Sequence, residues 1–232
     1  PRGAVACEVD KRLAMNEPTL RDEICRVGKS LFKRGYVHAT AGNISVRLDD
    51  GSFLITPTDA CLGFLDPARL AHVGADGVQT SGDTASKTLA LHRRIYASSD
   101  ARCVIHTHST HLVALTLQGV WSADDIVPPI TPYFVMKVGH VPLIPYHRPG
   151  DPAVADAVAE RIAQFAARGT PIRALMHDRL GPNVWHDSPA AAMAVLEELE
   201  ETARLWRMCD PKPAPLAAEQ IDALRRSFAA CW

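Results

Sequence analysis

The chain has 232 residues, with 25 Lys and Arg against 26 Asp and Glu and a formal net charge of −1. This balance provides no excess positive charge to attract nucleic acid or an anionic membrane, so we expect neither partner. The 47% hydrophobic and 22% charged content is that of a globular protein with one core, and no apolar run reaches the roughly 20 residues that span a bilayer. Six scattered cysteines without C-x-x-C spacing, and the lack of a signal-peptide core, predict reduced thiols in a cytoplasmic protein.

Apolar residues recur with alternating helix and strand periods along the chain. We expect a loose N-terminal segment over residues 1–17 and a single domain over 18–232, opening with a helix that starts at Thr19 and has Asp22 as a capping-box acid. Further helices are predicted to start at Asp66-Pro67, to span 84–96, 112–119, 152–167 and 188–209, and to include Ile221, Leu224 and Phe228 near the end of the chain. Strands are predicted at 43–47, 53–56, 141–144, 174–177 and 183–186, and from Cys103 through His106 and His108. This order predicts an α/β fold of three αβα layers, with a central mixed or antiparallel sheet flanked by helices.

The most informative stretch is the apolar run from Cys103, which ends in His106-Thr-His108. Side chains alternate along a strand, so His106 and His108 project to the same side, whereas His111 lies in the next helix and points elsewhere. Two imidazoles on one rigid face are a usual way to bind zinc or a similar divalent ion. The alternative is that both rings are polar strand-end residues bonded to the backbone.

Small polar residues gather at the ends of the predicted hairpin and before the helix that follows it. Asn43 opens the first strand, Thr58 and Asp59 follow the second, and Ser86 and Lys87 stand at a predicted helix N-terminus. Hydroxyl, ammonium and free backbone N–H groups at such a place suit a phosphate. The same residues are also ordinary turn formers and helix caps.

These motifs together resemble the class II aldolase/adducin family over nearly the whole chain. The matching segments are Ala41-Gly-Asn43-Ile-Ser45, Ile55-Thr-Pro-Thr58, Ser86 before a helix, His106-x-His108 and Gly181 in a late turn. The segments that resemble its 3-oxo-tetronate 4-phosphate decarboxylase branch are Thr131-Pro-Tyr133-Phe-Val-Met-Lys137, Pro142-Leu-Ile-Pro-Tyr146, Arg148-Pro-Gly-Asp151 and Glu197-Glu-Leu-Glu-Glu-Thr-Ala203.

The resemblance implies site residues, position by position. The phosphate cradle falls on Asn43, Thr58, Asp59, Ser86 and Lys87, and two of the three metal-binding histidines fall on His106 and His108. The metal is expected to be divalent, zinc first, with manganese, iron or cobalt as alternatives. The resemblance also implies a homotetramer with the site at a subunit boundary, acting on a small sugar acid phosphate.

Two positions depart from the family pattern. The third histidine should stand immediately before Gly181, where this chain has Leu180, and the catalytic carboxylate should follow Lys87, where it has Thr88. His177 is the first substitute for the missing ligand, and the other candidates are His140, His147, His186, Asp178, water and substrate.

The missing carboxylate bears on the reaction. An aldolase or epimerase must move a proton next to a carbonyl, which threonine does not do at neutral pH, whereas a 3-oxo acid loses carbon dioxide without a base. We therefore expect a decarboxylase that yields dihydroxyacetone phosphate, with Tyr133, Asp178 or metal-bound water as the proton donor. The alternatives are a sugar-phosphate aldolase or epimerase and a non-catalytic, adducin-like binding module.

Overall fold

The computed structural model describes residues 16–232. The first element in this range is helix α1 (Glu17–Lys33). The expected loose segment 1–17 therefore lies outside the described residues except for Asn16, which caps the helix, and Glu17, which begins it. The Asn16 side chain caps it by accepting a hydrogen bond from the Thr19 N–H at 3.0 Å. The predicted start at Thr19 is wrong by two residues, since Asn16 is the cap and Pro18 fits the first turn.

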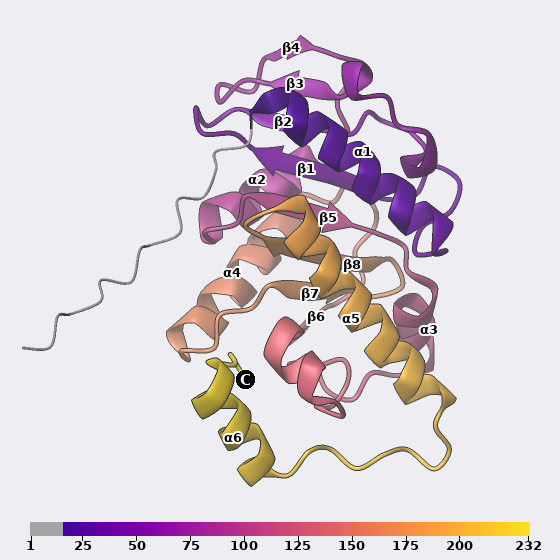
Figure 1. Ribbon diagram of the computed structural model, residues 1–232, viewed down its shortest axis with the longest axis vertical. Coiled ribbons are helices and arrows are strands. Elements are labelled where there is room, and N and C mark those ends of the chain that lie inside the picture. Colours follow the sequence, from indigo (N-terminus) through magenta and orange to yellow (C-terminus); the bar gives the residue numbers. More distant parts are fainter. Residues whose placement is uncertain (1–15) are drawn as a thin grey trace, which may run out of the picture.

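The strands described in residues 16–232 form one eight-stranded sheet (Figure 1). They are β1 (Asn43–Arg47), β2 (Phe53–Ile55), β3 (Ala71–Val73), β4 (Gln79–Ser81), β5 (Cys103–His106), β6 (Leu143–Ile144), β7 (Ala174–His177) and β8 (Gly181–His186). Their order is β4-β3-β2-β1-β5-β8-β7-β6, and the neighbours pair antiparallel except for the parallel β6 and β7. The expected mixed sheet is confirmed.

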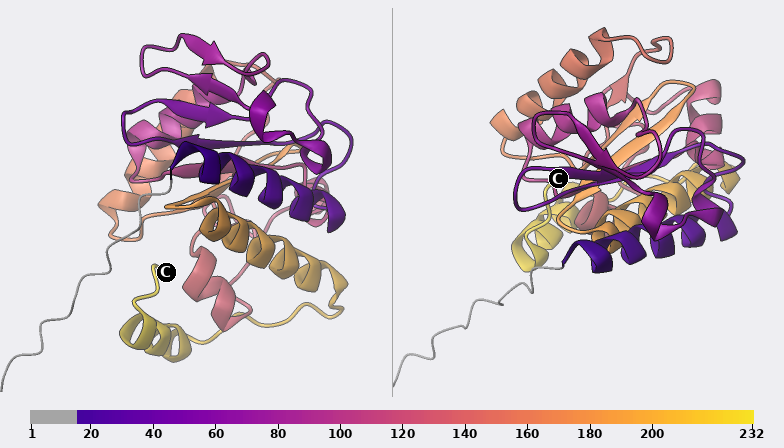
Figure 2. Two further views of the ribbon diagram at one scale, coloured as in Figure 1. Left: turned by 45° about the horizontal axis from the view of Figure 1, so that its top comes forward. Right: turned by 90° about the horizontal axis from the view of Figure 1, so that it is seen from above.

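Helices cover both faces of this sheet (Figure 2). The remaining helices are α2 (Leu89–Ser98), α3 (Thr110–Gln118), α4 (Ala153–Ala167), α5 (Pro189–Met208) and α6 (Ala218–Phe228), with short turns η1 (Leu62–Phe64), η2 (Pro67–Arg69) and the π-helical η3 (Phe134–Val138). Helices α1 and α5 pack on one face with α3, η3 and α6 beside them, and α2 and α4 pack on the other. The three-layer prediction is confirmed.

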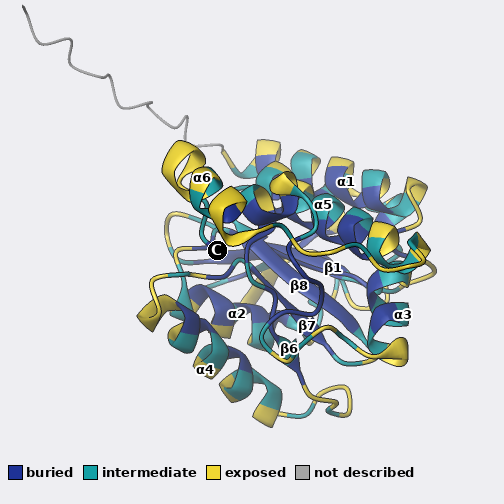
Figure 3. Cartoon of the chain, turned by 90° about the horizontal axis from the view of Figure 1, so that it is seen from below, coloured by how far each residue is buried: buried dark blue, intermediate teal, exposed yellow. Residues whose placement is uncertain are grey.

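Strand alternation decides which side chains face which layer. Ile44 and Ile105 belong to the core beneath α1 and α5, whereas Val104 belongs to the core beneath α2 and α4. Because alternate residues of a strand share a face, Ser45 and His106 project toward the α2 side. Figure 3 shows that the central strands are buried between the helical layers, so polar groups on this face lie inside the protein.

One local prediction needs correction, and two further features of the fold were not predicted. Helix α2 begins at Leu89, so Ser86 and Lys87 precede it instead of forming its first turn. Glu200 is not solvated with its neighbouring glutamates, because it is 2% exposed and accepts hydrogen bonds from the N–H groups of His111 and Leu112. The β3–β4 hairpin was not predicted, since β4 is exposed on every residue and carries no apolar alternation.

The described cysteines are free thiols, as expected, although only Cys103 among them is fully buried. Within residues 16–232, no helix has the length and apolar content needed to cross a membrane.

Candidate active site

His106 and His108 lie side by side at the end of β5. Their ring centres are 5.1 Å apart and the rings meet edge to face. Two imidazoles that share one tetrahedral ion, with metal–nitrogen distances of about 2 Å, have ring centres about 5 Å apart. The observed distance therefore matches a pair of ligands to a single ion.

The backbone of β8 fixes the orientation of His106. Its Nδ1 lies 2.9 Å from the carbonyl oxygen of Pro182, which can only accept, so Nδ1 carries the proton and Nε2 carries the lone pair. Burial, with the neighbouring His177 and His108, holds the pKa of His106 well below its usual range. Burial also lowers the pKa of His108. Both rings are thus neutral near pH 7, the state in which imidazole binds a metal.

A third histidine, His177, lies near the pair but is farther from His106 than His108 is. The ring centre of His177 lies 6.2 Å from that of His106, about 1 Å more than the spacing expected for two rings on one tetrahedral ion. His38 lies 6.5 Å from His108 on the opposite side of the pair. Within residues 16–232, no three His, Cys, Asp or Glu side chains are arranged to hold a metal ion. The residues present thus fit an ion with two protein ligands, the other positions being left to substrate, water or an adjusted His177.

The other candidate histidines each contact a carboxylate, although His147 is also close enough to His177 to help lower its pKa. His140 contacts the Asp125 carboxylate at 2.9 Å and stacks on Trp232. His147 pairs with Asp151 at 3.8 Å. His186 bonds Asp187 at 2.8 Å.

The residues predicted to bind phosphate lie in neighbouring loops. Asn43 is the cross-strand partner of His106, and its Oδ1 is buried with no hydrogen-bond partner among the described residues. The loops after β2 and before α2 are joined because the Thr58 hydroxyl donates to the Ala85 carbonyl at 3.0 Å and the Ser86 N–H donates to the Thr56 carbonyl.

This arrangement changes the expected phosphate contacts. The N–H groups of Thr58 and Ser86 bond backbone carbonyls, so the prediction that they stay free for an anion is wrong. Thr58 and Ser86 can therefore contact an anion only through their side chains. Ser86 is half-buried, whereas Thr58, Asp59 and Lys87 are exposed.

The two family positions that differ, and the two expected proton donors, are also placed. Thr88 bonds the Ser86 hydroxyl at 2.8 Å, and Leu180 lies in the turn between β7 and β8. Asp178 is half-buried in the same turn, 3.9 Å from Arg179. Tyr133 is 58% exposed and precedes η3, which packs on α5 and α6. In the structure Asp178 directly follows His177 at the end of β7, and among the described residues no hydrogen bond or ring contact joins Tyr133 to the histidines.

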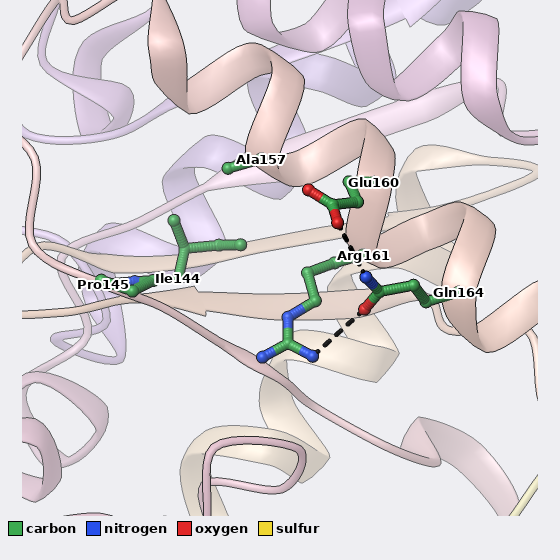
Figure 4. Close-up of a pocket in the computed structure, with 6 residues that line it drawn as sticks. All are labelled: Ile144, Pro145, Ala157, Glu160, Arg161 and Gln164. Atoms are coloured by element: carbon green, nitrogen blue, oxygen red, sulfur yellow. Dashed lines mark hydrogen bonds between the residues drawn. The ribbon is translucent and has the colours of Figure 1, made fainter.

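Surface hollows mark only part of this site. The pocket drawn in Figure 4, of about 370 Å³, lies between the end of β6 and α4 and contains none of the predicted site residues. Its polar lining is satisfied internally, since Gln164 bonds both Arg161 and Glu160. A second pocket of about 240 Å³ includes Thr58 and Asp59.

Sequence reasoning did not single out four buried polar residues beneath the site, namely Ser45, His92, Tyr96 and Asn183. All four lie between α2 and the sheet, with His92 and Tyr96 on the helix and Ser45 and Asn183 on the strands. They form a hydrogen-bonded chain that reaches His177. Polar residues at the alternate positions of apolar strands were the available signal, because such positions demand partners inside the protein.

Known proteins resemble the chain over most of its length. Residues 22–207 match the family described as class II aldolase and adducin N-terminal domain. A 3-oxo-tetronate 4-phosphate decarboxylase of Cupriavidus necator is 57% identical over 93% of this chain and 99% of that protein. The protein of the same name from Escherichia coli K12 is 43% identical over 90% and 96%.

A solved crystal structure also resembles the chain in fold and sequence. That of YgbL from Escherichia coli, a candidate aldolase, epimerase or decarboxylase, has a TM-score of 0.82 and 42% identity, covering 90% of this chain and 99% of that one. The family match spans both the histidine pair and the hydroxyl-bearing loops. The chain therefore belongs to the class II aldolase and adducin N-terminal domain family.

Proposed function

We propose that this protein is a carboxy-lyase that decarboxylates a 3-oxo-tetronate 4-phosphate-type sugar acid to dihydroxyacetone phosphate and carbon dioxide. The observation that carries the proposal is the 57% identity to a decarboxylase of that name across 99% of its length. The site is compatible with it, since a histidine pair lies beside hydroxyl-bearing loops and a buried amide oxygen without a partner.

The absent carboxylate at Thr88 fits this reaction better than aldol chemistry. In the decarboxylation, the bond between the carboxylate carbon and its neighbour breaks, carbon dioxide leaves, and the electron pair enters the adjacent oxo group as an enediolate. This step needs no base, and the product then needs one proton on carbon. An aldolase or epimerase needs a group that removes a proton, and the Thr88 hydroxyl does not serve at neutral pH.

The class II aldolase superfamily typically depends on a divalent metal. We assign His106 and His108 as its ligands here, with His177 as the third donor. A bound divalent ion supplies the positive charge that polarises the oxo group. Neutral imidazoles suit zinc first, with manganese, iron or cobalt as alternatives. Tyr133 and Asp178 are the proposed proton donors.

The phosphate is assigned to Asn43, Thr58, Asp59, Ser86 and Lys87. The Lys87 ammonium provides the positive charge and the Ser86 hydroxyl provides a hydrogen bond. The Thr58 hydroxyl donates to the phosphate only if it gives up its bond to the Ala85 carbonyl. The Asp59 carboxylate would repel a phosphate, so only its backbone can contribute favourably.

We further propose a cytoplasmic homotetramer in which the domain over residues 18–232 shares its site with a neighbour. The 58% exposure of Tyr133 supports this, because the ring is free to contact a second copy. Sedimentation should give a mass near four times 25.2 kDa. A monomer that remains active would contradict a shared site.

The test compares carbon dioxide release from 3-oxo-tetronate 4-phosphates with aldehyde release from ketose 1-phosphates, with and without chelator. We expect chelator-sensitive carbon dioxide and dihydroxyacetone phosphate in equal amounts, and loss of both in His106→Ala. Aldehyde release instead would show an aldolase, and no turnover of either class in a metal-loaded protein would favour a binding module.

A further inference from the structure

A chain of buried, hydrogen-bonded polar side chains runs from helix α2 along the facing side of the sheet to His177. Tyr96 Oη lies 2.7 Å from the Ser45 hydroxyl, which lies 2.7 Å from His92 Nδ1. His92 Nε2 lies 3.5 Å from Asn183 Nδ2, the longest link, and Asn183 Oδ1 lies 2.8 Å from His177 Nε2. All five residues are buried, so water does not compete for these bonds.

Counting hydrogens fixes the direction of the first links. Tyr96 has one hydroxyl hydrogen, and it is donated to the Ser45 carbonyl oxygen at 2.9 Å. The hydrogen between the two hydroxyls must therefore come from Ser45, which has only one to give. His92 Nδ1 must then donate to the Ser45 oxygen, because a 2.7 Å contact needs a hydrogen between its atoms.

Assigning hydrogens in the same way gives the protonated nitrogen of His177. Burial lowers the pKa of His92 to about 3, so the ring is neutral, and a proton on Nδ1 leaves a lone pair on Nε2. That lone pair accepts from the Asn183 NH₂ group, which turns the amide oxygen toward His177. An amide oxygen only accepts, so His177 carries its proton on Nε2 and its lone pair on Nδ1.

If the hydrogen bonds along the chain ran in the opposite direction, fewer of the observed contacts would have a hydrogen between their atoms. If Ser45 donated to His92, Tyr96 would have to donate to the Ser45 hydroxyl, and the 2.9 Å contact between Tyr96 and the Ser45 carbonyl would lack a hydrogen. The structure therefore favours one polarity along the whole chain, set by a tyrosine in another layer of the fold.

We propose that Asn183, His92, Ser45 and Tyr96 are positioning residues that hold His177 as its Nε2–H tautomer and so make Nδ1 its ligand-binding nitrogen. The kinetic part of this inference rests on the proposed function, whereas the tautomer does not. A histidine whose second nitrogen donates to a fixed acceptor is oriented and made a better ligand. The chain would thus provide for His177 what the Pro182 carbonyl provides for His106.

The tautomer can be measured in the intact protein labelled with 15N-histidine, since protonated and unprotonated ring nitrogens have different 15N shifts. The signals of His177 are assigned by their loss in His177→Gln. We expect Nε2 protonated in the wild type. In Tyr96→Phe, the Ser45 hydroxyl is released to donate to His92, so the Nδ1–H tautomer of His177 should appear. An Nδ1–H tautomer in the wild type, or an unchanged His177 spectrum in Tyr96→Phe, would overturn the proposal.

Variants of His92 separate positioning from simple packing. His92→Phe keeps the ring volume but removes the acceptor for Asn183, whereas His92→Gln restores an acceptor oxygen. We expect mixed His177 tautomers in His92→Phe and recovery of Nε2–H in His92→Gln. Asp125→Asn is the matched control, because it perturbs another carboxylate–histidine contact, that of buried Asp125 with half-buried His140, and should leave the His177 signals unchanged. An altered His177 spectrum in this control would contradict a specific chain.

Metal binding provides a second measurement. We expect the affinity for cobalt(II), followed by its visible absorption, to fall about 10-fold to 100-fold in His92→Phe and Asn183→Leu, and to recover in His92→Gln. If these variants bind cobalt as the wild type does, His177 is not positioned for an ion. If the tautomer and the cobalt results hold but no carbon dioxide is released, the proposed function fails and the positioning chain stands.

Discussion

At the scale of single residues, the positions that sequence patterns misjudged are polar groups with a partner from a distant segment. Glu200 stands among three other glutamates of a helix whose polar run reads as solvated, yet it bonds the first N–H groups of α3 at 2.9 and 3.1 Å. These are donors that a helix cannot satisfy internally, so a carboxylate from α5 replaces the usual local cap. No spacing rule links residues 89 positions apart.

Glu200 therefore gives the first stability prediction. Glu200→Gln keeps the shape of the side chain but offers one acceptor oxygen in place of two, and it turns an NH₂ group toward a backbone donor. We expect the free energy of unfolding in urea to fall by about 1–3 kcal/mol. The control Glu219→Gln, at an exposed position in the first turn of α6, should change it by less than about 0.5 kcal/mol. Equal losses in both variants would contradict the capping role.

The candidate site was predictable where residue type and period agree. The His106 and His108 pair follows from strand alternation, and the 5.1 Å ring spacing agrees with it. What could not be predicted is the partner of His106 Nδ1, because Pro182 comes from a strand that the chain reaches 76 residues later.

At the scale of elements, the apolar helices and central strands were predictable because burial imposes their period. Strand β7 begins and ends at the predicted residues, and β5 begins at the predicted Cys103 but ends at His106, before His108. Both strands pair on both sides, so their side chains are buried. The β3–β4 hairpin was missed because an edge strand with no apolar face leaves no periodic signal. Helix starts were missed where the capping residue stood outside the apolar pattern.

The turn between β7 and β8 gives the second prediction. Gly181 has φ +145°, and a Cβ there would lie 1.9 Å from the carbonyl oxygen of Thr107, between the two site histidines. Gly181→Ala must push β8 away from the end of β5, so we expect a loss of about 2–4 kcal/mol in unfolding free energy and weaker metal binding. Gly169→Ala is the control, since its φ is +75° with no atom within 4 Å, and it should cost about 1 kcal/mol without affecting metal. Retained metal affinity in Gly181→Ala would show that the close approach does not position the histidines.

At the scale of the whole molecule, the buried imidazoles couple folding to pH. His92 has an ordinary pKa near 6.5 when unfolded and about 3 when folded, because burial disfavours its charged form. Between these values the unfolded chain binds the extra proton, so stability is full above pH 6.5 and is lost as the pH falls toward 3.

This coupling is measurable by substitution. His92→Gln removes the titrating group, so the difference in unfolding free energy between wild type and variant should shrink by about 2–3 kcal/mol between pH 7 and pH 4.5. Urea unfolding at the two pH values measures it. A difference that does not change with pH would mean that His92 is already accessible to protons in the folded state.

Metal analysis of the purified protein tests directly whether His106 and His108 at the end of β5 hold one ion. After purification from metal-replete medium, we predict one divalent ion per chain in the wild type and none in folded His106→Ala. No ion in the wild type, or the same content in both proteins, would contradict the assignment of the site.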